Sequence, residues 1–232
     1  MSISRSIRTL AAIGAVAAAA AGCGDGSGGL PDAEFLLRGA RAAGADIDSA
    51  HVEMTTSAPI AGLAVRELTA DVRARQGAEP GASAGEAVVS GLRMRFVERD
   101  GQLLARDASG KYLPASAFSA NMGQLPNPSV LLDPDRGLTR MLRNFRDPRT
   151  EIRETHEGVQ AFRVAGDIPQ EDARTWLPEL RQDARLVVWF ATSGRHLPVA
   201  ARLSMPDESG RIASIDFALS DLNKKVGIPD VS

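Results

Sequence analysis

The chain has 232 residues, with 27 basic and 29 acidic side chains, a net charge of −2 and one cysteine. This balance argues against a nucleic-acid-binding protein, because such proteins carry clustered positive charge. A single cysteine cannot form an intramolecular disulfide, so the fold must be stabilised by packing. The length is sufficient for one domain with a sizeable core.

The first 22 residues have the features of an exported precursor. Two arginines form a short basic region, and Leu10–Ala21 forms an apolar run that is too short to span a bilayer. Small residues then precede Cys23, as in the lipobox of bacterial lipoproteins, although Ala20 stands where that motif usually has leucine. We predict a lipoprotein signal peptide over residues 1–22 and lipid attachment at Cys23. An ordinary secretory peptide is the alternative.

Residues 23–30 are rich in glycine and are expected to form a flexible tether. Loss of residues 1–22 removes two arginines and no acid, so the mature chain keeps 25 basic and 29 acidic residues, a net charge of −4. Residues 31–232 are predicted to form a single domain. A first helix is predicted over Pro31–Ala43, because proline and aspartate suit its start and apolar residues share one face.

Alternation of apolar and polar residues predicts four strands in the first half of this domain. They span residues 51–56, 66–73, 92–98 and 102–106. Asp100-Gly101 has the composition of a hairpin turn between the last two. The stretch 76–85, rich in glycine and alanine, is expected to be a mobile loop.

The middle of the chain is predicted to be helical. Asp133 suits an N-cap and Pro134 a first helical position, and apolar residues recur at helical spacing from Leu138 to Phe145. Asp147-Pro148 is expected to end this helix.

Five more strands and a short helix complete the domain. The strands span residues 151–155, 160–168, 186–192, 199–205 and 211–219, and the helix spans 170–176. About nine strands joined by short turns predict an antiparallel sheet, and a sheet of this size should curl. The helices should then cover its apolar face.

A set of short motifs recurs in order along the mature chain. They are Asp133-Pro134 with Gly137-Leu138, then Gly158, the strand Phe162–Gly166, Val188-Trp189, His196-Leu197-Pro198 and Lys224-Lys225-Val226. Together with the cysteine at the end of the signal peptide, this order resembles the LppX/LprAFG lipoprotein family of actinobacteria.

The resemblance implies an α+β fold: a strongly bent antiparallel β half-barrel with helices packed on the concave face, similar in shape to the LolA and LolB carriers. It also implies a membrane-anchored protein on the extracytoplasmic side of the cell membrane. Its partners would be acylated envelope lipids or glycolipids, whose chains lie in an apolar cavity, and a membrane transporter is a candidate partner. Members of the family are not enzymes, and no cofactor is implied.

The apolar strand and helix faces are the candidate lining of this cavity. The candidates are Val52, Met54, Leu68, Val72, Leu92, Met94, Phe96, Leu138, Leu142, Val164, Val188, Ile215 and Phe217. Ordinary core packing is the alternative for each of them. A carrier should contain a contiguous cavity well above the volume of about 1,000 Å³ that bounds ordinary ligand pockets.

Two other functions are alternatives to a lipid carrier. A scaffold without cargo, which partners a transporter or a cell-wall protein, predicts a filled core. A hydrolase is suggested by Gly81–Gly85, which fits the G-x-S-x-G pattern with Ser83 as nucleophile, but the residues before it do not form the strand that this motif requires. The three histidines lie far apart in the sequence, so a zinc site is not expected.

Overall fold

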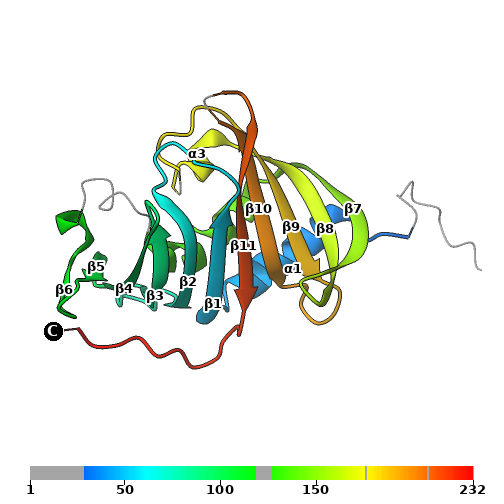
Figure 1. Ribbon diagram of the computed structural model, residues 1–232. Helices are drawn as coiled ribbons and strands as arrows, with labels where there is room; N and C mark the ends of the chain where they lie inside the picture. Colours follow the sequence, from blue (N-terminus) through cyan, green and yellow to red (C-terminus); the bar gives the residue numbers. More distant parts are fainter. Residues whose placement is uncertain (1–28, 119–126, 176, 208, 232) are drawn as a thin grey trace, which may run out of the picture.

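The computed structural model describes residues 29–118, 127–175, 177–207 and 209–231. Within them the chain forms one open antiparallel sheet of eleven strands (Figure 1). The strands are β1 (Ser49–Thr56), β2 (Val65–Arg73), β3 (Ala82–Val89), β4 (Leu92–Arg99), β5 (Gln102–Arg106), β6 (Tyr112–Pro114), β7 (Arg146–His156), β8 (Val159–Ile168), β9 (Ala184–Ala191), β10 (Pro198–Pro206) and β11 (Ile212–Ser220). The helices are α1 (Ala33–Gly44), α2 (Leu138–Arg143) and α3 (Gln170–Ala173), with 3-10 turns η1 (Ala115–Ala117) and η3 (Pro128–Leu132).

The sheet consists of two meanders joined by its first and last strands. The strand order is β6-β5-β4-β3-β2-β1-β11-β10-β9-β8-β7. Every neighbouring pair is consecutive in the chain except β1 and β11, which pair from His51↔Ser220 to Thr56↔Ile215. This one long-range ladder places both halves of the chain in a common sheet.

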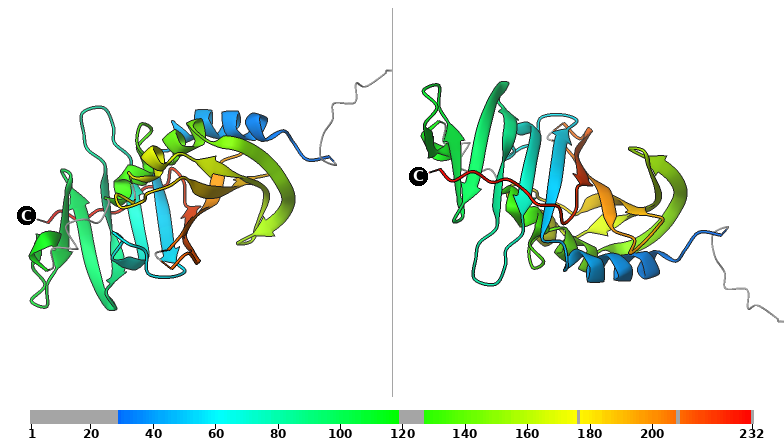
Figure 2. Two further views of the ribbon diagram at one scale, coloured as in Figure 1. Left: turned by 90° about the horizontal axis from the view of Figure 1, so that it is seen from above. Right: turned by 90° about the horizontal axis from the view of Figure 1, so that it is seen from below.

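The sheet is strongly bent, and Figure 2 shows the yellow-green β7 sweeping in a wide arc at one end of the sheet, with α1 alongside the beginning of this arc. Pairing shifts register at Arg146/Arg149 and Thr150/Ile152 in β7 and at Pro198/Ala200 in β10. Such bulges bend a strand and increase its twist. The bent antiparallel sheet with helices on its concave face confirms the predicted fold class.

Helix α1 packs an apolar stripe against the sheet. Asp32 caps its first turn, since its carboxylate accepts a hydrogen bond from the Phe35 backbone nitrogen at 3.0 Å. Leu36, Leu37 and Ala40 are fully buried. These side chains join the concave faces of the strands and α2 in one continuous core.

A buried carboxylate ties the small helices together. Asp172 of α3 accepts hydrogen bonds from Arg140 Nε and Asn144 Nδ2, both at 2.7 Å. Because Arg140 lies in α2 and Asn144 directly follows it, α2 is fixed to α3. A paired and hydrogen-bonded carboxylate is tolerated in the core, whereas an unpaired one is not.

Residues 221–231 follow β11 and run past the ends of β1–β4 (Figure 1). The Asn223 backbone nitrogen donates to Ser49 O at 2.9 Å, and Ser49 Oγ donates to Lys224 O at 2.6 Å. Asp230 forms an ion pair with Arg99 at the end of β4. Residues 224–226, which the resemblance places in a terminal strand, are not in a strand.

Several predicted boundaries are wrong for local reasons. Strand β3 begins at Ala82, inside the predicted loop 76–85, because the sheet pairs this stretch with β2 and β4. Neither β3 nor the short strand β6 is among the strands predicted from the sequence. Helix α2 begins after Gly137 and not at Asp133, whose carboxylate instead accepts from the Asp135 backbone nitrogen and from Arg136.

The predicted end of this helix is also wrong. The helix ends at Asn144, which is its C-cap, so Asp147 and Pro148 lie inside β7. Because β7 is an edge strand, a proline without a backbone N–H is tolerated there.

We expect Gly85→Ala to destabilise the fold by at least about 3 kcal/mol, at the upper end of the cost of overpacking. A Cβ at Gly85 would lie 2.0 Å from Thr69 O and 2.7 Å from Ala70 Cα, which are backbone atoms of β2. Urea unfolding measures the loss. Gly39→Ala in α1 is the control, since its Cβ would meet only Arg195 O at 3.6 Å, and it should gain about 0.5–1 kcal/mol. A Gly85→Ala protein as stable as the parent would contradict the close approach of β2 and β3.

Candidate functional site

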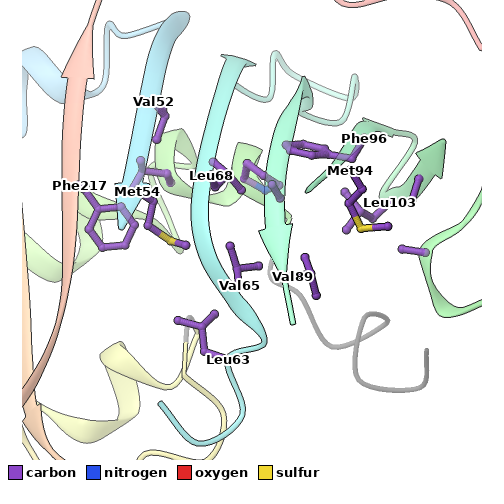
Figure 3. Close-up of a pocket in the computed structure, with 15 residues that line it drawn as sticks. Val52, Met54, Leu63, Val65, Leu68, Val89, Met94, Phe96, Leu103 and Phe217 are labelled. Carbon is purple, nitrogen blue, oxygen red and sulfur yellow. The ribbon is translucent and has the colours of Figure 1, made fainter. Parts of the chain in front are cut away.

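An apolar pocket lies between the concave face of β1–β5 and the turns η1 and η3 (Figure 3). Among the described residues, no charged or hydrogen-bonding side chain belongs to its lining. The lining residues are Val52, Met54, Leu63, Val65, Leu68, Ala87, Val89, Met94, Phe96, Leu103, Ala105, Ala115, Pro128, Leu131 and Phe217. Such a lining can bind hydrocarbon by the hydrophobic effect and can fix no polar group.

The pocket is narrow. Its cavity volume is about 40 Å³, whereas ordinary ligand pockets hold about 300–1,000 Å³. This pocket is therefore far smaller than the cavity expected from the sequence. A long acyl chain can enter only if the elements around the pocket move apart.

The structure brings six of the thirteen candidate residues to the pocket: Val52, Met54, Leu68, Met94, Phe96 and Phe217. Six others are buried elsewhere in the same core: Val72, Leu138, Leu142, Val164, Val188 and Ile215. Leu92 does neither, because its side chain is 71% exposed. It is the first residue of β4 and pairs with Val89, the last of β3, so it lies at the tip of the hairpin, beyond the pocket.

Sequence reasoning missed nine lining residues. Those of β3 lie in a strand whose first half was read as loop, although Ser90-Gly91 is a turn signal directly before a predicted strand. Those of η1 and η3 gave no periodic signal, because 3-10 turns are too short to show one. The missed residues are Leu63, Val65, Ala87, Val89, Leu103, Ala105, Ala115, Pro128 and Leu131.

A buried glutamate holds η3 on the sheet beside the pocket. Glu98 of β4 is only 1% exposed and accepts hydrogen bonds from Ser83 Oγ at 2.8 Å and from the Ser129 backbone nitrogen at 3.0 Å. Ser129 Oγ also donates to this carboxylate. Ser129 stands between Pro128 and Leu131, which both line the pocket. Glu98 therefore links β3, β4 and η3 at one point.

Burial raises the pKa of Glu98 above 4.5, since desolvation of the charged carboxylate is the largest effect. The hydrogen bonds from Ser129 and Ser83, and the charge of Arg136, lower its pKa by less. The carboxylate lies on the concave face in the same row as Phe96 and Met94, which pair with Gly85 and Ala87. Glu98 is therefore the point at which η3, one wall of the pocket, is held to β4.

This cluster also accounts for the G-x-S-x-G pattern. Ser83 is fully buried as the second residue of β3 and donates to Glu98, so it is not placed on the exposed strand-to-helix turn of a hydrolase nucleophile. A Cβ at Gly81 would lie 2.6 Å from Ser129 Cβ. The glycines allow close packing of η3 and β2, and the serine satisfies the buried carboxylate.

Two further features of the described residues limit the chemistry of the site. They contain no group of three or more His, Cys, Asp or Glu side chains arranged to hold a metal ion. They also include no helix with the length and apolar character needed to cross a membrane. Cys23, the predicted point of lipid attachment, and the signal peptide 1–22 lie outside the described residues.

Comparison with known proteins points to one family. The LppX_LprAFG lipoprotein family matches residues 32–228. The lipoarabinomannan carrier protein LprG of Mycobacterium bovis (strain BCG / Pasteur 1173P2) is 30% identical over 236 residues, covering 98% of this chain and 97% of that protein. The protein of the same name from Mycobacterium leprae (strain TN) is 28% identical over 240 residues, with 98% and 97% covered.

Solved structures show the same fold. LprF from Mycobacterium bovis has a TM-score of 0.71 at 20% sequence identity, covering 86% of this chain and 97% of that chain. LppX from Mycobacterium tuberculosis has a TM-score of 0.64 at 20% identity, with 85% and 100% covered.

We expect Glu98→Gln to change how stability depends on pH. The folded protein holds the Glu98 proton more tightly than the unfolded chain does, so Glu98 contributes stability at low pH that is lost as the pH rises through its raised pKa. Glutamine does not ionise, so the Glu98→Gln variant does not lose stability in this way as the pH rises. Its free energy of unfolding, relative to the parent, should rise from pH 4 to pH 7 in urea titrations.

Ser129→Ala is the matched control for this prediction. It removes one hydrogen bond and should cost about 1 kcal/mol, but it keeps the ionisable Glu98. Because the lost bond lowers the pKa of Glu98, the stability of this variant should still fall from pH 4 to pH 7, by at least as much as in the parent. A Glu98→Gln difference that stays constant over this pH range would contradict the raised pKa.

Proposed function

Because the chain belongs to the LppX_LprAFG lipoprotein family, we propose that it is a membrane-anchored lipid carrier. In this proposal it binds acyl chains of envelope lipids or glycolipids in the pocket of β1–β5 and assists their transport across the cell envelope. The observation that carries the proposal is a pocket lined only by apolar side chains inside a bent sheet. The related LprG proteins are named as lipoarabinomannan carriers, which is consistent with a lipid ligand of this class.

Binding in such a pocket requires no chemical step. Transfer of each methylene from water to an apolar surrounding contributes about 0.8 kcal/mol, so a long chain binds without a specific polar contact. The charged or polar end of the lipid must stay outside, since the pocket offers it no partner. We therefore assign this protein no catalytic residue.

The narrow pocket requires a wall that yields when a chain enters. The turn η3 is the candidate, because it contributes Pro128 and Leu131 to the lining and is a short 3-10 turn. The turn is held to Glu98 by hydrogen bonds, and water can replace these bonds more easily than it can replace an apolar contact of the core. In this proposal, the acyl chain of the lipid takes the place that the η3 side chains occupy against the sheet.

A scaffold without cargo is the second candidate function, because the small cavity volume of about 40 Å³ is what a filled core predicts. Native mass spectrometry separates the two. A carrier expressed without residues 1–23 in a lipid-rich host should retain a copurifying lipid. Protein that is consistently free of lipid would favour the scaffold.

We expect affinity for monoacylglycerols to rise about fourfold for each added methylene, as 0.8 kcal/mol per methylene implies. Ala87→Phe should abolish this binding, since Ala87 lines the pocket and is 4% exposed. Ala84→Phe is the matched control, because Ala84 belongs to the same strand and points to its opposite face. Calorimetric titration measures both. Affinity that does not depend on chain length would contradict burial of the chain.

We also propose that residues 1–22 are removed, that Cys23 carries the lipid anchor on the extracytoplasmic side of the membrane, and that residues 23–30 form a tether to one domain over 31–232. Two or three acyl chains hold a protein firmly, whereas one gives marginal binding. Cys23→Ser should therefore move the protein from the membrane fraction to the soluble fraction and prevent incorporation of radiolabelled palmitate. Labelling of the serine variant at the level of the parent would overturn the assignment.

A further inference from the structure

A second, polar groove opens beside the apolar pocket at the edge of β4. Its volume is about 480 Å³. It is lined by Arg93, Met94, Arg95, Arg106, Asp107, Ala108, Ser109 and Gly110. Met94 belongs to the lining of both the groove and the pocket. The two spaces therefore adjoin at this residue.

The groove exists because β5 is shorter than β4. Strand β5 pairs with β4 only from Phe96↔Ala105 to Arg99↔Gln102. In the part of the chain that the structure describes, the segment Leu92–Arg95 has no strand partner on this side. The turn that follows Arg106 lies across the resulting notch, and the notch leads to the side chain of Met94.

Three arginines belong to the lining of this groove, and Arg93 and Arg95 alternate with Met94 along β4, so they lie on the other face of the strand. The side chains of Arg93 and Arg95 are 65% and 61% exposed. Arg95 Nε donates to Glu86 at 3.1 Å, and Arg93 lies 3.6 Å from the same carboxylate and 3.7 Å from Glu67. Exposed pairs of this kind contribute little to stability, so a competing anion can displace them.

Arg106 and Asp107 belong to the turn itself. Arg106 Nε donates to Gly110 O at 3.1 Å, which fixes its guanidinium against the turn. Asp107 accepts from Ser109 Oγ at 2.7 Å and from the Lys111 backbone nitrogen at 2.9 Å. These bonds direct the carboxylate of Asp107 into the turn. The Arg106 guanidinium keeps further N–H donors for a ligand, because a guanidinium carries five.

We propose that this groove binds the anionic phosphate head group of a lipid whose acyl chain lies in the neighbouring pocket. The inference rests on the proposed function, since it places the two ends of one ligand in two adjoining spaces. Arginine suits this task, because its planar fork of N–H donors matches phosphate oxygens. The acyl chain would pass the side chain of Met94, which is flexible and can shift aside.

The test compares two lipids that share one acyl chain. Lysophosphatidylglycerol carries a phosphate, and the monoacylglycerol of the same chain does not. The full domain should bind the phospholipid at least tenfold more tightly at low salt, and this preference should shrink as sodium chloride is added. In the variant R93Q/R95Q/R106Q the preference should disappear while affinity for the monoacylglycerol stays unchanged.

Arg211→Gln is the matched control. Arg211 is an exposed arginine that pairs with Asp207 at the β10–β11 turn, outside the groove, so its loss should keep the full preference. Urea unfolding of each variant verifies that the domain is folded, and Arg106→Gln alone, which should lose part of the preference, provides a milder change.

The outcomes separate this inference from the proposed function. If neither lipid binds, the carrier proposal fails. If both bind equally, or if the triple variant keeps the preference, only the head-group site fails. Inorganic phosphate is the remaining probe: saturation of the groove by phosphate alone at the concentration where the lipid saturates it would identify a free-anion site and overturn the head-group assignment.

Discussion

The ladder between β1 and β11 is the constraint on which the rest of the structure depends. All other pairings join strands that are consecutive in the chain and can form locally, whereas this one joins residues 51–56 to residues 215–220. It brings Phe217 opposite Met54, and both line the pocket. Without it, the N-terminal strands would lose one wall of the pocket and the C-terminal strands would lose their continuation. Long-range pairing of this type is formed late and slowly, because closure of a long loop costs entropy before any contact offsets it.

The hydrophobic pattern was sufficient to predict most of the sheet. Strands such as β1 and β11 alternate cleanly, so their buried faces were identified correctly, as Ile215 and Phe217 show. Strand β3 is absent from the predicted strands, because alanine, glycine and serine give little contrast between its faces. Their small size has a packing cause that only the structure shows: β2 and η3 approach this strand too closely for a Cβ at Gly81 or Gly85.

The site could be predicted only in part, for a related reason. Strand periodicity identifies which residues point to the concave side, but not where helices fill that side. Val164 and Val188 lie under the helices and are core, whereas Met94 and Phe96 lie beyond them and line the pocket. Leu92 has the correct alternation but lies at the exposed tip of the β3–β4 hairpin. The buried Glu98 could not be recognised either, since its partner Ser129 is 31 residues away in the sequence.

The two edge strands of the sheet, β7 and β6, differ in length, but neither favours pairing with the strand of another molecule. Strand β7 is long, yet it carries a proline, two register shifts and mainly exposed polar side chains, and β6 has only three residues. Neither edge offers a long, flat row of unpaired backbone groups to another molecule. A protein with an open sheet and a large apolar interior thus resists polymerisation through its strands. Edge-to-edge growth into fibrils is thus opposed by the backbone and by the charged side chains of its borders.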